Sequence, residues 1–205
     1  MPYDGIIDIS HWQGTPKLAA AKAAGFDAVI IKATQGSNVP DATFAANYAE
    51  AQNAGLLRGV YHFGEGGNGV AQADFFLNTV DPDAATLVAL DFERNRGGAS
   101  MSIQDAVDFV THVHDKLGRW PVLYGGGGLK DALNGRPNAV LNQCPLWLAQ
   151  YGPNAVLPPG WAAWMLWQFS DDNANKPDVP VPGVSPCDRD RFAGDRADLA
   201  AQWPF

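Results

Sequence analysis

The chain has 205 residues, of which 46% are hydrophobic and 18% are charged, so it can bury one sizeable core. Its 14 Lys and Arg residues against 22 Asp and Glu residues give a net charge of −8, without any basic cluster. This balance excludes an electrostatic surface for nucleic acid or for an anionic membrane, and no apolar segment is long enough to span a bilayer.

The first two thirds of the chain alternate expected strands with expected helices. A strand at residues 5–10 leads into a loop, and Thr15 with Pro16 then begins a helix that ends at Gly25. Asp41 is expected to cap the second helix, and Ser102 with Asp105 forms a capping box for a later one. The other expected strands cover residues 26–34, 57–63, 86–93 and 121–124, and a further helix runs through residues 71–77.

The last third of the chain continues with strands after the helical pattern stops near Gly135. Apolar runs at residues 145–151 and 164–169, with a short one near 187–188, bring the total to eight strands against about five helices. Parallel strands joined by crossovers, with the final helices missing, predict an α/β fold: an incomplete TIM-like barrel, (β/α)5(β)3. We expect one domain over residues 1–205, with residues 171–186 as a surface loop.

Carboxylates stand at the ends of several expected strands. Asp91 and Glu93 end an apolar run and, being one alternate position apart, face the same way. Neighbouring carboxylates couple their titrations and raise one pKa, which is what acid/base chemistry at neutral pH requires. Taken alone, this stretch is equally typical of the polar end of a buried strand. Asp8 and Asp188 add two more acids at strand ends.

Aromatic and polar side chains accompany these acids. Because the carboxyl ends of barrel strands form the active-site face, we expect all of them in one acidic, aromatic cleft that suits a sugar substrate. The candidate substrate contacts are Tyr61, His62, Tyr124, Gln150, Tyr151 and Trp167. For His62 and Trp167, packing in the core is the alternative interpretation.

Seven segments, in order, resemble the family 25 glycoside hydrolases, the Ch-type muramidases. They are GIIDISHWQG at 5–14, AVIIKAT at 28–34, GVYHF at 59–63, LDFE at 90–93, LWLAQY at 146–151, LWQF at 166–169 and VPGV at 181–184. The resemblance implies an incomplete barrel that hydrolyses the β-1,4 bond between N-acetylmuramic acid and N-acetylglucosamine in bacterial peptidoglycan, a lysozyme activity. It also implies that Glu93 is the general acid, that Asp91 is its partner, and that Asp8 and Asp188 are further acids of the cleft.

A substrate-assisted mechanism is favoured, because both sugars carry a 2-acetamido group whose oxygen can attack the anomeric carbon. The alternatives are an N-acetylglucosaminidase acting on a related glycan and a glycan-binding barrel without catalysis. Loss of an acid would mark the second, and both acids of the pair are present. Glycan strands are the expected partner of a monomer, without a cofactor or a metal.

Three features depart from the resemblance or compete with it. Residues 64–69 and 125–128 are unusually rich in glycine, and Asp190 stands where the family's closing Asp-x-Asn segment has Asn. Residues 64–69 also match the dinucleotide-binding pattern G-x-G-x-x-G, with Asp91 downstream as the ribose ligand. That hypothesis places the pattern on the third strand and leaves Asp8, Glu93 and Asp188 without a role.

The chain carries no visible secretory signal and no repeat module for wall binding. We therefore expect an enzyme that reaches the cell wall either by release from inside a cell, as a phage endolysin does, or by secretion after its signal was removed. Cys144 and Cys187 leave open a disulfide or two buried free thiols.

Overall fold

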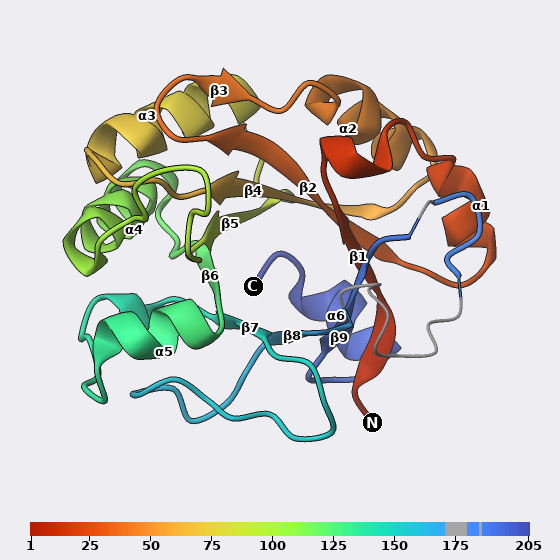
Figure 1. The fold of residues 1–205 in the computed structure, drawn as a ribbon. Helices are drawn as coiled ribbons and strands as arrows, with labels where there is room; N and C mark the ends of the chain where they lie inside the picture. Colours follow the sequence, from red (N-terminus) through yellow and green to blue (C-terminus); the bar gives the residue numbers. More distant parts are fainter. Residues whose placement is uncertain (171–179, 185) are drawn as a thin grey trace.

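The computed structural model describes residues 1–170, 180–184 and 186–205. Its nine strands form one sheet in the order β1-β9-β8-β7-β6-β5-β4-β2-β3. An additional pairing between β1 and β2 closes eight of these strands into a barrel, with β3 outside the ring (Figure 1). Most of the expected loop at residues 171–186 lies outside the described residues.

The barrel strands are β1 (Tyr3–Ile9), β2 (Ala28–Gln35), β4 (Leu57–Phe63), β5 (Leu87–Asp91), β6 (Val122–Gly125), β7 (Leu146–Ala149), β8 (Leu166–Ser170) and β9 (Asp188–Phe192). The helices are α1 (Leu18–Ala23), α2 (Phe44–Asn53), α3 (Gly69–Val80), α4 (Ile103–Leu117), α5 (Gly127–Leu133) and α6 (Arg196–Gln202). The short elements are β3 (Val39–Pro40) and the 3-10 helices η1 (His11–Gln13) and η2 (Leu141–Gln143). Helices α1 to α5 lie around the outside of the barrel, as Figure 1 shows.

The last strand runs against the others. Seven barrel strands pair in parallel, whereas β9 is antiparallel to both of its neighbours, β1 and β8. An antiparallel strand brings its amino end to the edge where parallel strands have their carboxyl ends. Asp188, the first residue of β9, therefore pairs with Asp8 near the end of β1.

Alternation along the strands sorts the core into an inner and an outer part. The barrel interior is filled by Ile6, Ala28, Ile30, Leu87, Ala89, Val122, Leu166 and Phe192, among others. Phe205, after α6, stacks on Phe192, which pairs with Tyr3 at the start of β1. The carboxyl-terminal segment thus covers the barrel interior at the amino ends of the parallel strands, so the opposite end is the one left for a site.

Several local predictions are confirmed and others are wrong. The Ser102 capping box forms at α4, where it stabilises the helix by about 1 kcal/mol. Helix α1 begins at Leu18 without a side-chain cap, not at Thr15 and Pro16. At α2 the cap position is Thr43, and the Asp41 carboxylate accepts a hydrogen bond of 2.9 Å from the Thr43 amide just before the helix. Helix α5 begins inside residues 125–128, and α6 was not predicted.

The two cysteines are buried free thiols. Cys144 belongs to the core between the barrel and its outer helices, and Cys187 packs in a separate cluster with residues of β1, β2 and α1. Within the described part of the chain, no helix has the length and apolar character needed to cross a membrane.

Candidate active site

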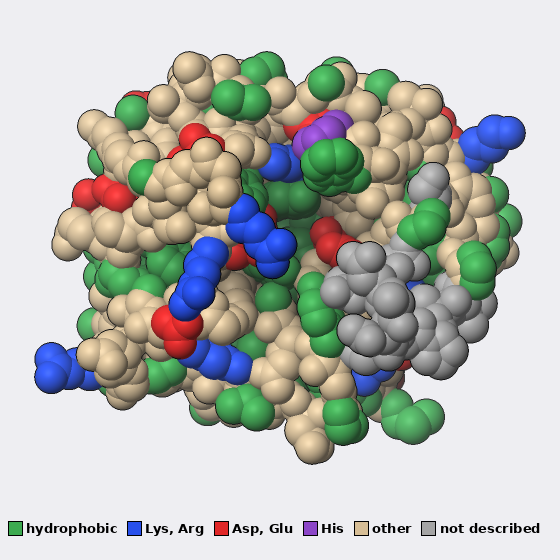
Figure 2. Space-filling view, in the orientation of Figure 1, with side chains coloured by type: hydrophobic (Ala, Val, Ile, Leu, Met, Phe, Trp, Pro, Cys, Tyr) green, Lys and Arg blue, Asp and Glu red, His purple; other side chains and the backbone are tan. Residues whose placement is uncertain are grey.

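A pocket of about 160 Å³ opens at the carboxyl ends of the parallel strands. Figure 2 shows it as a hollow in this face, with acidic side chains inside and basic side chains along one side. The residues that line it are Asp8, Tyr61, Asp91, Glu93, Tyr124, Trp147, Tyr151, Gln168 and Asp188. All four predicted acids are therefore brought together, with three of the predicted aromatic contacts.

Strand alternation places these side chains. Asp8 lies two residues after Ile6, which faces the barrel interior, and Asp91 lies two residues after Ala89, which does the same. The pairing of Asp91 with Tyr124 on β6 keeps both at the same level. The pocket is thus the last layer of the barrel interior, where polar side chains replace apolar ones.

Asp91 and Glu93 differ in their surroundings. Asp91 ends β5 and is buried, and burial together with the neighbouring charge of Glu93 raises its pKa well above the usual range. Glu93 lies beyond the end of the strand. Protein surrounds its carboxyl group on most sides, and the remaining part of the residue is exposed to solvent in the cleft. Burial also raises the pKa of Glu93. A pair of this kind retains a proton to higher pH than free carboxyl groups do.

Lys32 provides positive charge beside the pair. Its ammonium group donates a hydrogen bond of 2.7 Å to Gln35 and lies 4.7 Å from the centre of the Phe63 ring. Burial lowers the pKa of Lys32, and the charge of Lys32 in turn opposes the rise in the pKa values of Asp91 and Glu93. Sequence analysis did not select Lys32, although it follows Ile30 at the alternate position of β2 and so faces the interior.

Gln168 connects the remaining groups of the pocket. Its amide nitrogen donates to Asp8 at 2.9 Å and to Asp188 at 3.0 Å. Its amide oxygen accepts from the Tyr124 hydroxyl at 2.8 Å and from the Tyr151 hydroxyl at 2.9 Å. One buried side chain therefore fixes two acids and two aromatic residues, and the only sequence signal for it was its place on the inner face of β8.

Asp190 lies one alternate position beyond Asp188 and is fully buried. Its Oδ1 atom accepts a hydrogen bond of 2.6 Å from the Trp147 indole, and its side chain shares a hydrogen bond with that of Asp8. Burial raises the pKa of Asp190 to about 8; the hydrogen bond from Trp147 opposes the rise and the charge of Asp188 adds to it. Burial also raises the pKa of Asp8, and the charge of Asp190 adds to that shift.

A wider cleft of about 960 Å³ continues from this pocket. The two share Glu93, Tyr124 and Tyr151 as lining residues. Gln150 lies on the wall of the cleft, where its side-chain oxygen accepts a hydrogen bond of 2.7 Å from Lys130. Trp12, which sequence analysis did not select, lies on the same cleft with 82% of its surface exposed.

The structure contradicts two predicted substrate contacts. His62 is fully buried, stacks on Phe109 at 4.9 Å between ring centres, and bonds to Thr34 and Gln72. Burial lowers its pKa to about 4, so it is a neutral core histidine. Trp167 is likewise buried in the outer core. His62 follows the inward-facing Tyr61, and Trp167 precedes the inward-facing Gln168. Because side chains alternate along a strand, both point away from the pocket.

The glycines of residues 64–69 serve packing. Gly64 donates to the Asp91 carbonyl at 3.0 Å and Gly66 to the Ala99 carbonyl at 2.8 Å. A Cβ atom at Gly69 would overlap the carbonyl oxygen of Asp105. Because the loop lies against its neighbours in this way, the dinucleotide hypothesis finds no support. Among the described residues there is also no group of three or more His, Cys, Asp or Glu that could hold a metal ion.

Comparison with known proteins agrees with this geometry. The family described as "Glycosyl hydrolases family 25" matches residues 7–178. The chain is 35% identical to Lysozyme M1 of Streptomyces globisporus, over 95% of this chain and 69% of that protein. It is 34% identical to the N,O-diacetylmuramidase of a Chalaropsis species, over 80% of this chain and 87% of that protein. The crystal structure of the bacterial lysozyme from Streptomyces coelicolor superposes with a TM-score of 0.85 at 35% identity, covering 98% of this chain and 96% of that one.

The raised pKa of Asp190 predicts how stability depends on pH. Between pH ~4, where an Asp of the unfolded chain ionises, and pH about 8, the folded protein holds a proton that the unfolded chain has released. Within that window this group lowers the free energy of unfolding by about 1.4 kcal/mol per pH unit as the pH rises. Asp190→Asn removes this ionisation. The free energy of unfolding of the variant should therefore exceed that of the wild type by an amount that grows from pH 5 to pH 8.

Urea unfolding at several pH values measures this difference. Asp108→Asn on α4, whose carboxylate accepts an exposed hydrogen bond from Gln104, is the matched control and should leave the pH dependence unchanged. If the free energies of unfolding of the wild type and of Asp190→Asn changed with pH in the same way, Asp190 would already be ionised in the folded protein.

Proposed function

The chain belongs to glycosyl hydrolase family 25 and is a glycoside hydrolase, and from that premise we propose that it acts as a lysozyme. Its substrate is the β-1,4 bond between N-acetylmuramic acid and N-acetylglucosamine in bacterial peptidoglycan. Relatives named lysozyme and N,O-diacetylmuramidase support this choice of bond. The observation that carries the proposal is that two carboxyl groups, those of Asp91 and Glu93, line one pocket with tyrosine side chains.

Glu93 is the general acid in this proposal. It lies where the small pocket meets the wide cleft, so a strand that enters the cleft passes beside its carboxyl group. Its raised pKa keeps the group protonated to higher pH than an ordinary Glu, as proton donation to the glycosidic oxygen requires. When the leaving sugar departs with that proton, the Glu93 carboxylate can accept a proton from the attacking water in the second step.

Asp91 stabilises the intermediate. Its Oδ1 atom is buried and has no hydrogen-bond partner among the described residues, so it is free to accept one from the substrate. The N–H of a 2-acetamido group is a fitting donor. As that group's oxygen attacks the anomeric carbon, positive charge develops on the new ring, and the Asp91 carboxylate stabilises it while Glu93 carries the proton to be donated.

The other predicted residues have supporting roles. Asp8 and Asp188, both held by the Gln168 amide, keep the floor of the pocket acidic. The aromatic rings of Tyr61 and Tyr124 form its walls. Tyr151 and Gln150 reach into the wide cleft and contact the sugars that flank the cleaved bond.

The proposal extends to the barrel type and to the way in which the protein reaches its substrate. We interpret the barrel as a (β/α)5(β)3 variant of the TIM barrel, in which the last three strands lack outer helices. Residues 1–205 act as one catalytic unit, a monomer that works on the cell wall without a cofactor. It reaches the wall after secretion or after release from a lysing cell, as endolysins do.

Digestion of purified peptidoglycan tests the activity and the role of Glu93 together. Glu93→Gln should lower the rate about 10²–10⁴-fold, the usual contribution of general acid catalysis. The products are reduced and identified by mass spectrometry, and the wild type should give reduced muramic acid ends. Glu50→Gln on α2, a helix that supplies no lining residue to either cavity, is the control and should digest normally.

Two outcomes would contradict the proposal. Reduced glucosamine ends would keep the site but make the protein a glucosaminidase. A wild-type protein that binds the wall without releasing any fragment would make it a binding module.

The configuration of the first product tests the part played by the acetamido group. Two successive displacements at the anomeric carbon retain its configuration, so proton NMR of a fresh digest should show the β-anomer before mutarotation. The α-anomer as first product would mean direct attack by water and would exclude an intermediate formed by the substrate.

A further inference from the structure

Trp12 is exposed in a way that its surroundings do not explain by packing. With 82% of its surface exposed, it leaves an indole ring in water although single aromatic side chains are usually much more covered. It does not lie on an open surface, because it lines the wide cleft together with Glu93, Tyr124 and Tyr151. The ring therefore borders the same space as the general acid.

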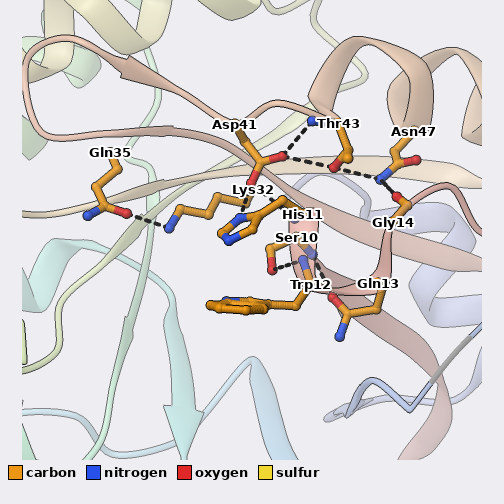
Figure 3. A network of polar contacts seen from close by, with 10 residues as sticks. All are labelled: Ser10, His11, Trp12, Gln13, Gly14, Lys32, Gln35, Asp41, Thr43 and Asn47. Carbon is orange, nitrogen blue, oxygen red and sulfur yellow. Dashed lines mark hydrogen bonds and ion pairs between the residues drawn. The ribbon is translucent and has the colours of Figure 1, made fainter.

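The loop that carries Trp12 is held firmly from the first barrel strand. The Ser10 hydroxyl accepts a hydrogen bond from the Trp12 amide, and the Ser10 amide donates one to the side-chain oxygen of Gln13, which closes a capping box around η1. The Asn47 side chain on α2 donates to the Gly14 carbonyl at 3.0 Å. Figure 3 shows these contacts gathered on one side of the loop, with the Trp12 ring projecting away from them.

His11 and Asp41 fix the direction of the ring. The His11 imidazole lies 4.6 Å from the Trp12 ring, centre to centre, and bonds to the Asp41 carboxylate at 2.9 Å. The same carboxylate accepts from the His11 amide at 3.1 Å, and its side chain is fully buried. Burial acts to raise the pKa of Asp41, but hydrogen bonds from Thr43 and His11 outweigh it and bring the pKa below the usual value. The carboxyl group is therefore ionised and holds His11 in place.

The rest of the cleft combines polar groups with aromatic rings. Asn95, Arg96 and Gln150, from the segments that follow β5 and β7, line it together with Tyr124 and Tyr151. A space with an exposed indole ring, further aromatic rings and several polar groups suits a pyranose, which has an apolar face and a rim of hydroxyl and acetamido groups. A protein partner would need a much larger contact surface than these few side chains provide.

We propose that Trp12 is a stacking platform for a further amino sugar of the glycan strand, beyond the two joined by the cleaved bond, and that His11 and Asp41 position it. This inference rests on the proposed function. The platform makes the enzyme favour long strands, because only a strand that extends along the cleft reaches the ring.

The test compares fragments of different length. All variants are made in the Glu93→Gln background, so that fragments are bound without being cleaved, and affinities for soluble peptidoglycan glycans of two and of six sugars are measured by calorimetry. Trp12→Ala should weaken binding of the six-sugar glycan about tenfold, the effect of one aromatic contact. Binding of the two-sugar glycan should stay the same, and Trp12→Phe should recover much of the loss.

Two further variants separate positioning from general damage. His11→Gln keeps the indole ring but removes its neighbour, so it should weaken the six-sugar glycan alone, by less than Trp12→Ala does. Val70→Ala removes another exposed apolar side chain, on α3 and outside both cavities, and should change neither affinity.

The outcomes are distinct. The platform would be overturned if Trp12→Ala bound the six-sugar glycan as tightly as its parent, or if it lost the same affinity for both glycan lengths. The lysozyme proposal would still stand, provided that the protein with Glu93 digests peptidoglycan. Failure of that protein to digest or to bind peptidoglycan would overturn the proposed function, and this inference with it.

Discussion

The site depends on one constraint, the alternation of side chains along strands that are closed into a barrel. Each inward position must be filled, and the apolar layer of Ile6, Ile30 and Ala89 fills the middle of the barrel. One step further along the same strands the inward positions carry Asp8, Lys32 and Asp91. The acids are therefore held at a fixed height in a space from which protein atoms exclude most of the water. Their positions follow from the fold and need no dedicated loop.

That placement also decides the protonation states. Five acids, Asp8, Asp91, Glu93, Asp188 and Asp190, occupy a small region, and Lys32 is the cation whose charge reaches both members of the catalytic pair. Burial and mutual repulsion raise the pKa values of most of these acids, so the group retains protons to higher pH than free carboxyl groups do. Folding this cluster costs stability, and the gain is a proton donor that faces the substrate. Such opposition between stability and activity is common where buried acids do chemistry.

Much of this could be predicted from the sequence, and the failures have physical causes. The barrel, the Ser102 cap and the convergence of Asp8, Asp91 and Glu93 followed from hydrophobic periodicity and from the rule that parallel strands end at one face, whereas Asp188 joins them through the reversed strand β9. His62 and Trp167 were selected by their nearness to strand ends, although alternation excludes each once Tyr61 and Gln168 are known to face inward. The reversed direction of β9 could not be predicted, because strand pairing is a long-range choice that a local pattern does not encode. Trp12 was missed since exposure depends on the loop network with Asp41, thirty residues away.

We expect Asp91 and Glu93 to titrate as a pair at raised pKa values. NMR titration of the protein labelled with ¹³C at the side-chain carboxyl carbons measures this directly, with Asp91→Asn and Glu93→Gln to assign the signals. Both carboxyl groups should titrate above the usual range of ~3.9 to ~4.3, and each substitution should shift the titration of the remaining partner downward. Two independent titrations at ordinary values would contradict the account, because the pocket would then hold no coupled pair and Glu93 would be no better a proton donor than a surface carboxylate.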